Sequence, residues 1–220
     1  MITLFENYKT MSSYVASAVA ETIESNPNCK LGLPTGSTPI AMYKNLIQFD
    51  LDWSNVKTFN LDEYENISHV HPESYHMYMR KNLFSHVNLK EKNIHFPNNE
   101  YDKTIKDEGG LDITILGIGH NGHIAFNEPG SPLTSKTRKV KLAEETIQAN
   151  SRFFKTVDEV PTRAFTMGLQ TIRESKRIIL IANGSDKWNI LDECFNGNVT
   201  TDRPASMLQG HPKIEVFHAS

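Results

Sequence analysis

Short apolar runs alternate with amphipathic stretches along the chain, and this alternation limits the possible folds more than any other feature. Apolar runs typical of buried strands lie at residues 2–5, 29–33, 56–61, 93–97, 112–119, 176–182 and 213–217. Helical spacing of apolar residues marks the stretches 12–26, 40–49, 72–87 and 188–195. Strands separated by helices connect by right-handed crossovers, so the sequence predicts an α/β fold whose mainly parallel sheet carries helices on both faces.

The length and composition exclude several classes of protein. A chain of 220 residues can bury a stable core without disulfide bonds or bound metals. Its net charge is −3 and it has no long basic stripe, which argues against nucleic-acid binding. Cys29 and Cys194 lie far apart and outside any CxxC pair, so we expect both to be reduced and buried. No apolar run approaches the ~20 residues of a membrane span, and residues 1–10 lack the layout of a signal peptide. The sequence thus predicts a soluble, cytoplasmic protein with no nucleic-acid or membrane partner.

Four unusual polar segments each follow a predicted strand directly. They are Pro-Thr-Gly-Ser-Thr-Pro at 34–39, Asp-Glu-Tyr at 62–64, the segment 119–130 (GHNGHIAFNEPG) and Asn-Gly-Ser-Asp-Lys at 183–187. Ligands of open α/β sheets bind beyond the carboxyl ends of the strands. We therefore expect the four segments to share one site.

The segment 34–39 suits an anion. Gly36 permits a tight turn with free N–H groups, and Ser37 and Thr38 add hydroxyls. With Thr38 as the N-cap and Pro39 as the first helical residue, a helix N-terminus would face a phosphate. Neither a Walker pattern nor GxGxxG is present, so no nucleotide is indicated. The alternative interpretation is an ordinary, well-capped turn.

The segments at 62–64 and 119–130 carry groups suited to proton transfer. Asp62 and Glu63 end a strand, where partial burial can give a carboxylate a pKa suited to a base; a solvated acidic turn is the alternative. His123 can exchange protons near neutral pH, and Glu128 could hydrogen-bond its ring and raise its basicity, although a lone surface histidine is also common. His120 and His123 lack further ligands at suitable spacing, so the sequence predicts no metal site.

Two cationic side chains could complete a phosphate clamp. Arg152 would supply a bidentate fork, and Lys187, which follows a predicted strand, would supply a point charge. Both could equally be solvated surface residues. Arg152 lies in the polar stretch 142–165, which we expect to form a helix and loop above the sheet.

Six motifs resemble, in order, the glucosamine-6-phosphate deaminase family. They run from about Leu31 toward the C-terminus and read LGLPTGSTP, FNLDEY, HPESY, LGIGHNGHIAFNEPG, ANSRFF and PTRAFTMG. FNLDEY and GHIAFNEPG are the most specific of them. The resemblance implies a single Rossmann-like domain over residues 1–220 with no cofactor. It also implies a hydrolase or deaminating isomerase of amino-sugar catabolism, which converts glucosamine 6-phosphate and water to fructose 6-phosphate and ammonia.

The resemblance also implies roles for individual residues. Asp62 matches the base that moves a proton between C2 and C1, His123 the residue that assists ring opening, and Glu128 its carboxylate partner. Asn121 occupies a ring-opening position that is Asp in some members and Asn in others, and with Asn the histidine has one fewer neighbouring charge. The substrate-phosphate site is matched by Thr35, Gly36, Ser37, Thr38, Arg152 and Lys187. Residues 142–165 match a lid that closes over the sugar.

One departure concerns regulation. Regulated members bind N-acetylglucosamine 6-phosphate at a subunit interface, and Ser131 and Arg138 match that site, but Val140 stands where a lysine is expected. The resemblance therefore predicts weak or absent activation, in a monomer or a homo-oligomer. Two rival functions remain at this stage: a 6-phosphogluconolactonase, and a sugar-phosphate sensor without catalytic groups. Asp62 argues against the lactonase, which needs no base at C2, and the joint presence of Asp62, His123 and Glu128 argues against the sensor.

Overall fold

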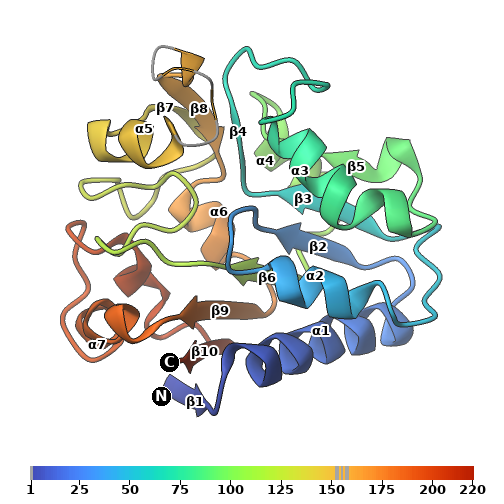
Figure 1. Cartoon of the computed structure of the whole chain (residues 1–220), viewed down its shortest axis with the longest axis horizontal. Coiled ribbons are helices and arrows are strands. Elements are labelled where there is room, and N and C mark those ends of the chain that lie inside the picture. Colours follow the sequence, from blue (N-terminus) through green and yellow to red (C-terminus); the bar gives the residue numbers. More distant parts are fainter. Residues whose placement is uncertain (1, 152–153, 155, 157–158) are drawn as a thin grey trace.

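The main sheet has seven parallel strands. The computed structural model describes residues 2–151, 154, 156 and 159–220, and Figure 1 shows the strands at the centre of the molecule. Their spatial order is β1-β10-β9-β6-β2-β3-β5. Their bounds are β1 Ile2–Phe5, β2 Lys30–Leu33, β3 Lys57–Asn60, β5 Ile94–His95, β6 Ile113–Leu116, β9 Ile178–Asn183 and β10 Ile214–Ala219.

Helices cover both faces of this sheet. One core contains residues from α1 (Tyr8–Ser25), α2 (Ile40–Leu46) and α3 (Tyr75–Asn82). The other contains residues from α4 (Tyr101–Asp107), α6 (Leu169–Arg173) and α7 (Trp188–Phe195). In β9, Ile179 and Ile181 belong to the first core and Ile178 and Leu180 to the second, as expected for a strand buried on both sides. The predicted fold class is confirmed.

Several helix boundaries differ from the prediction for local reasons. Helix α1 begins at Tyr8 rather than at residue 12, because Asn7 and Thr10 form a capping box. Helix α3 begins at Tyr75 rather than at 72, because the Ser74 side chain accepts a hydrogen bond from the N–H of Met77. Helices α4 and α6 were not predicted.

A second, smaller sheet was also not predicted. It is antiparallel, in the order β4-β8-β7, from Asp62–Tyr64, Arg163–Thr166 and Arg138–Lys141. The segment Asp-Glu-Tyr, expected at the end of the strand 56–61 with a solvated acidic turn as the alternative, is a separate short buried strand, which excludes the turn. Helix α5 (Glu144–Ser151) falls within the stretch 142–165 and β8 extends one residue past its end, and Leu142, Ile147 and Val160 join the core of this sheet. In Figure 1, α5 and the strands β7 and β8 lie together at one side of the molecule.

The order of the main sheet contains one switch point. From β2 the chain continues outward to β3, whereas from β6 it continues in the other direction to β9 and β10, and β2 and β6 are neighbours. Loops that leave the carboxyl ends of such neighbours separate and leave a crevice, which is where ligands bind in open α/β sheets.

Two further predictions concern the cysteines and the membrane. Cys29 and Cys194 are both buried and free, as expected. Of the helices that the structure describes, none combines the length and the apolar character needed to cross a bilayer.

Candidate active site

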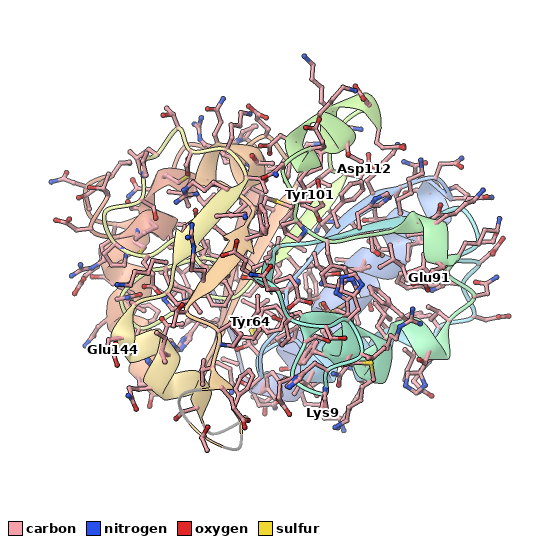
Figure 2. The ribbon with its side chains drawn as sticks, turned by 90° about the horizontal axis from the view of Figure 1, so that it is seen from above. Lys9, Tyr64, Glu91, Tyr101, Asp112 and Glu144 are labelled. Carbon is pink, nitrogen blue, oxygen red and sulfur yellow. The ribbon has the colours of Figure 1, made fainter. Side chains whose placement is uncertain are left out.

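A cavity of about 790 Å³ lies at the switch point. The loops after β2, β6 and β9 line it, together with the first residue of β4. Figure 2 places Tyr64 of β4 near the middle of the molecule and Glu144, the first residue of α5, toward one side. The cavity brings together most of the predicted site residues, namely Thr35, Gly36, Ser37, Thr38, Asp62, Asn121, His123 and Lys187.

The loop after β2 presents unused hydrogen-bond donors to the cavity. Within the described part of the chain, the N–H groups of residues 35–38 and the hydroxyls of Thr35, Ser37 and Thr38 have no acceptor. Gly36 has φ +89°, a conformation that disfavours side chains, and a Cβ there would meet only open space. The loop therefore needs glycine for its backbone conformation.

The predicted capping of α2 is wrong by one position. Pro39 is the N-cap, the helix begins at Ile40, and no side chain caps it. The Thr38 hydroxyl is thus not used as a cap and remains free beside the cavity. The anion-binding argument depends on the loop N–H groups rather than on a capped helix terminus.

Asp62 is the buried carboxylate of the site. It is 7% exposed, and no described residue donates a hydrogen bond to its side chain. Burial, and secondarily the charge of Glu63, raises the pKa of Asp62 from 3.8 to about 8. A carboxylate with such a pKa is a strong base once it is ionised.

Glu63 has a structural role. Its carboxylate accepts hydrogen bonds from the N–H groups of Tyr64 (2.9 Å), Tyr75 (3.1 Å) and His76 (3.0 Å), and contacts His76 Nδ1 at 2.9 Å. These bonds place a negative charge on the first turn of α3, where the helix dipole favours it. Glu63 thereby fixes α3 to β4 and holds Tyr75 at the cavity wall.

His123 reaches Glu128 mainly through Asn121. The Asn121 amide oxygen is 2.8 Å from His123 Nδ1, and its Nδ2 donates to Glu128 Oε2 at 2.8 Å. The expected direct contact between His123 Nδ1 and Glu128 Oε2 is longer, at 3.4 Å. Asn121 is thus a relay between the histidine and the carboxylate.

Glu128 lies behind the cavity wall and is held as an anion. Although burial opposes its ionisation, contacts with His123, Thr146 and Asn121 lower the pKa of Glu128 to about 2. Thr146 belongs to α5 and donates its hydroxyl to Glu128 Oε1 at 2.7 Å. The segment that resembles a lid therefore contacts Glu128 directly.

Close packing shapes the loop after β6. A Cβ on Gly119 would lie 2.2 Å from the His123 ring, so only glycine lets the imidazole occupy this place. Ala125 has φ +50°, which is unfavourable for alanine. The neighbouring Asn127 donates from Nδ2 to the carbonyls of Ile124 (3.0 Å) and Met167 (2.8 Å), which holds the strained turn.

Lys187 is a cation of the cavity wall. It ends the 3₁₀ helix Ser185–Lys187 after β9, and its Nζ donates to the carbonyl of Ile118 at 3.1 Å. Burial lowers the pKa of Lys187. Arg152, its expected partner, lies outside the described residues. His120 is exposed, and its Nε2 contacts Asp186 at 2.7 Å. The described residues contain no group of three or more potential metal ligands.

Sequence reasoning missed several residues of the cavity wall. Tyr8 comes from α1, Tyr75 from α3, Phe126 from the loop after β6 and Thr146 from α5. Only tertiary packing brings these four together, so no local pattern could have identified them. For Thr146, the only sequence signal was that its segment was expected to lie above the sheet, close to the site.

The family model described as glucosamine-6-phosphate isomerases/6-phosphogluconolactonase matches residues 5–216. This chain belongs to that family. The match begins closer to the N-terminus than Leu31, where the motif resemblance starts, so α1 lies within the family match together with the last residue of β1.

Two similar proteins agree with the motif resemblance. A curated relative from Thermoanaerobacter pseudethanolicus, named glucosamine-6-phosphate deaminase, is 46% identical over 225 residues, which cover 96% of this chain and 89% of that protein. A solved structure of a monomeric glucosamine-6-phosphate deaminase has a TM-score of 0.95 at 39% identity, over 99% of this chain and 96% of that one.

A third comparison shows the fold alone. The 6-phosphogluconolactonase from Thermotoga maritima has a TM-score of 0.80 at 19% identity, over 100% of this chain and 99% of that one. Family membership and fold are thus common to deaminases and lactonases, and the choice between them depends on the site.

Proposed function

We propose that this protein is a glucosamine-6-phosphate deaminase, which converts glucosamine 6-phosphate and water to fructose 6-phosphate and ammonia in amino-sugar catabolism. One observation carries the proposal: a single cavity holds the donor-rich loop 35–38 and Lys187 together with Asp62 and His123. A deaminase needs both an anion grip and a base for a C–H proton. The names of the relatives at 46% and 39% identity support the same assignment.

The phosphate group provides the grip. The N–H groups and hydroxyls of residues 35–38 donate to its oxygens, and Lys187 adds a positive charge. Arg152 is proposed to complete the clamp from the segment above the sheet. With the phosphate held in this way, the sugar ring extends toward Asp62 and His123.

Ring opening comes first. His123 transfers a proton between the O1 hydroxyl and the ring oxygen O5, so that the C1–O5 bond breaks and C1 becomes an aldehyde. Asn121 holds the imidazole through Nδ1, and the ionised Glu128 stabilises the positive charge that the imidazole acquires when it takes up a proton.

Asp62 then carries out the isomerisation. Its carboxylate takes the proton from C2, which leaves the anion of an enolamine with its charge shared by O1, and returns the proton to C1. One proton passes from the nitrogen to O1, which leaves a C1 hydroxyl and an imine at C2. Water adds to the imine carbon, and ammonia leaves as the C2 carbonyl of fructose 6-phosphate forms. Water is consumed overall, but the chemistry is a deaminating isomerisation, which describes the enzyme better than the broader word hydrolase.

The rivals are separable by experiment. Lactone hydrolysis does not require a base that removes a proton from C2, and a sensor that only binds a sugar phosphate does not require a proton-transferring histidine. Ammonia release from glucosamine 6-phosphate, coupled to glutamate dehydrogenase, should be robust for the native chain. Asp62→Asn should abolish it while nearly preserving sugar-phosphate affinity, and Asp107→Asn, a change on the exposed end of α4, should not alter it.

The outcomes of this assay are distinct. Hydrolysis of 6-phosphogluconolactone without ammonia release would establish the lactonase instead. Sugar-phosphate binding with no turnover of either compound would establish the sensor.

We further propose that the enzyme acts as a cytoplasmic monomer. The structural relative at 39% identity is described as monomeric, and the charged phosphate confines such a substrate to the compartment where it is made. Light scattering after gel filtration should give the mass of one 24.9 kDa chain.

A further inference from the structure

We propose that three tyrosine hydroxyls, those of Tyr8, Tyr43 and Tyr78, position the loop 34–38 so that its N–H groups face the anion. This inference rests on the proposed sugar-phosphate site and names the residues that preorganise it. They are positioning residues, because they act on the substrate through the loop backbone.

The shortest bonds of the three hydroxyls go to every second carbonyl of the loop, and Tyr8 also contacts the carbonyl of Ser37 at 3.4 Å. Tyr43 donates to the carbonyl of Pro34 at 2.6 Å, Tyr78 to that of Gly36 at 2.5 Å, and Tyr8 to that of Thr38 at 2.7 Å. The tyrosines come from three different helices: α1 carries Tyr8, α2 carries Tyr43 and α3 carries Tyr78.

Peptide geometry converts these bonds into control of the N–H groups. In a trans peptide the C=O and the next N–H point in opposite directions, and none of the described peptide bonds is cis. The carbonyl of Pro34 shares a peptide plane with the N–H of Thr35, and that of Gly36 with the N–H of Ser37. Tyr43 and Tyr78 do not line the cavity, so carbonyls held toward them direct both N–H groups toward the opposite side.

Anion binding benefits in two ways. A carbonyl oxygen that turned into the cavity would repel a phosphate and would compete for the same donors. A hydrogen bond to a carbonyl also polarises its peptide unit, which makes the attached N–H a stronger donor. The loop therefore meets the phosphate with its donors already oriented and without a reorganisation cost.

Tyr8 has a related function at the end of the loop. Its hydroxyl donates to the carbonyl of Thr38 and accepts a hydrogen bond from the N–H of Ala41 at 3.1 Å, which ties the loop to the first turn of α2. Because Tyr8 also lines the cavity, its substitution would mix two effects. Tyr43 and Tyr78 give the cleaner test.

Burial keeps these two hydroxyls as donors. Tyr43 is fully buried, and burial raises the pKa of both Tyr43 and Tyr78 above the ordinary value of 10.0. Both remain protonated across the pH range in which a sugar phosphate carries its charge. Tyr43→Phe and Tyr78→Phe remove only the hydroxyl and keep the ring.

A matched control exists in Tyr101. It is also buried, and its hydroxyl also donates to backbone carbonyls, those of Asn60 (2.8 Å) and His95 (3.2 Å), neither of which belongs to the loop. In Figure 2, Tyr101 lies on the far side of the molecule from Lys9, which follows Tyr8 in the sequence. Tyr101→Phe therefore measures the general effect of removing a buried tyrosine hydroxyl.

The experiment measures inorganic phosphate binding by calorimetry and, separately, KM and kcat for ammonia release. Tyr43→Phe and Tyr78→Phe should each weaken phosphate binding and raise KM by about 3- to 10-fold, as expected for one hydrogen bond, with kcat within about 2-fold. Tyr101→Phe should leave phosphate affinity unchanged.

Wild-type phosphate affinity in both variants, or an equal loss in Tyr101→Phe, would overturn the inference. If Tyr43→Phe fails to fold, Tyr78→Phe decides alone, because its ring is only partly buried. Phosphate binding is measured independently of the reaction. A native chain that releases no ammonia would refute the proposed function, and the phosphate titrations would still test whether the tyrosines position the loop.

Discussion

Asp62→Asn should stabilise the folded protein relative to the native chain, and the gain should increase with pH. In the folded chain Asp62 keeps its proton up to a pKa of about 8, whereas the unfolded chain loses it near 3.8. Between these values the unfolded state binds fewer protons than the folded state, so the stability contributed by neutral Asp62 is complete below pH 3.8 and is lost as pH rises toward 8. Asp62→Asn cannot ionise and does not suffer this loss.

The magnitude follows from the width of the window. The difference in unfolding free energy between Asp62→Asn and the native chain should grow by ~1.4 kcal/mol per pH unit and become constant above the folded pKa. The interval from 3.8 to about 8 sets an upper limit of about 6 kcal/mol. Because the carboxyl lines a cavity that solvent can enter, we expect a gain of at least about 2 kcal/mol at pH 8 relative to pH 4.

Urea denaturation from pH 4 to pH 9 measures this difference directly. Glu24→Gln, which removes one exposed charge on α1, is the matched control and should change stability by less than about 0.5 kcal/mol at every pH. The same titration predicts that kcat/KM rises with pH up to about 8, since only the ionised carboxylate accepts a proton. A difference that stops growing near pH 4 would show that Asp62 has an ordinary pKa and would refute the reasoning.

Four further predictions concern the site and its support. His123→Gln should slow turnover of the closed-ring sugar by about 100-fold but leave binding of a reduced, open-chain amino-sugar phosphate intact, and equal losses in both would remove its assigned role. Asn121→Asp places a second carboxylate beside Glu128, so the pKa of Glu128 should rise from about 2 in an NMR titration of the side-chain carboxyls; an unchanged pKa would exclude the relay. N-acetylglucosamine 6-phosphate should change KM by less than about 2-fold because Val140 replaces the expected lysine, and clear activation would show otherwise. Glu63→Gln weakens the bonds to the first turn of α3 and should cost about 1–3 kcal/mol in urea denaturation, whereas native stability would contradict its structural role.

The main sheet could be predicted from sequence because each of its strands is a locally visible apolar run. The small sheet could not. Strand β4 has only three residues, too few to show a period of two, and it pairs with β8 far along the chain. The pairing of Asp62 with Thr166 joins residues far apart in the sequence, so no short stretch of sequence could predict it.

The residue types of the site were predictable, but their contacts were not. Carboxylates and a histidine after strand ends indicated proton transfer at the correct edge of the sheet. Spacing along the chain does not say which way a side chain points, so the Asn121 relay between His123 and Glu128 was not apparent. The tyrosines that bind the loop carbonyls lie on three helices, and only the packed structure brings their hydroxyls to one loop.

The proposed reaction also needs the two sheets to be held in a fixed position relative to each other, because Asp62 belongs to one and the His123 loop to the other. Asp62 begins β4, and the histidine loop follows β6. Thr166 of β8 connects them: it pairs with Asp62 in the ladder, and its hydroxyl accepts the N–H of Phe126 at 3.1 Å. The next residue continues the link, since Met167 donates its N–H to the carbonyl of Leu61 at 2.7 Å and accepts the amide of Asn127. The small sheet therefore works as a fixed spacer between Asp62 and His123.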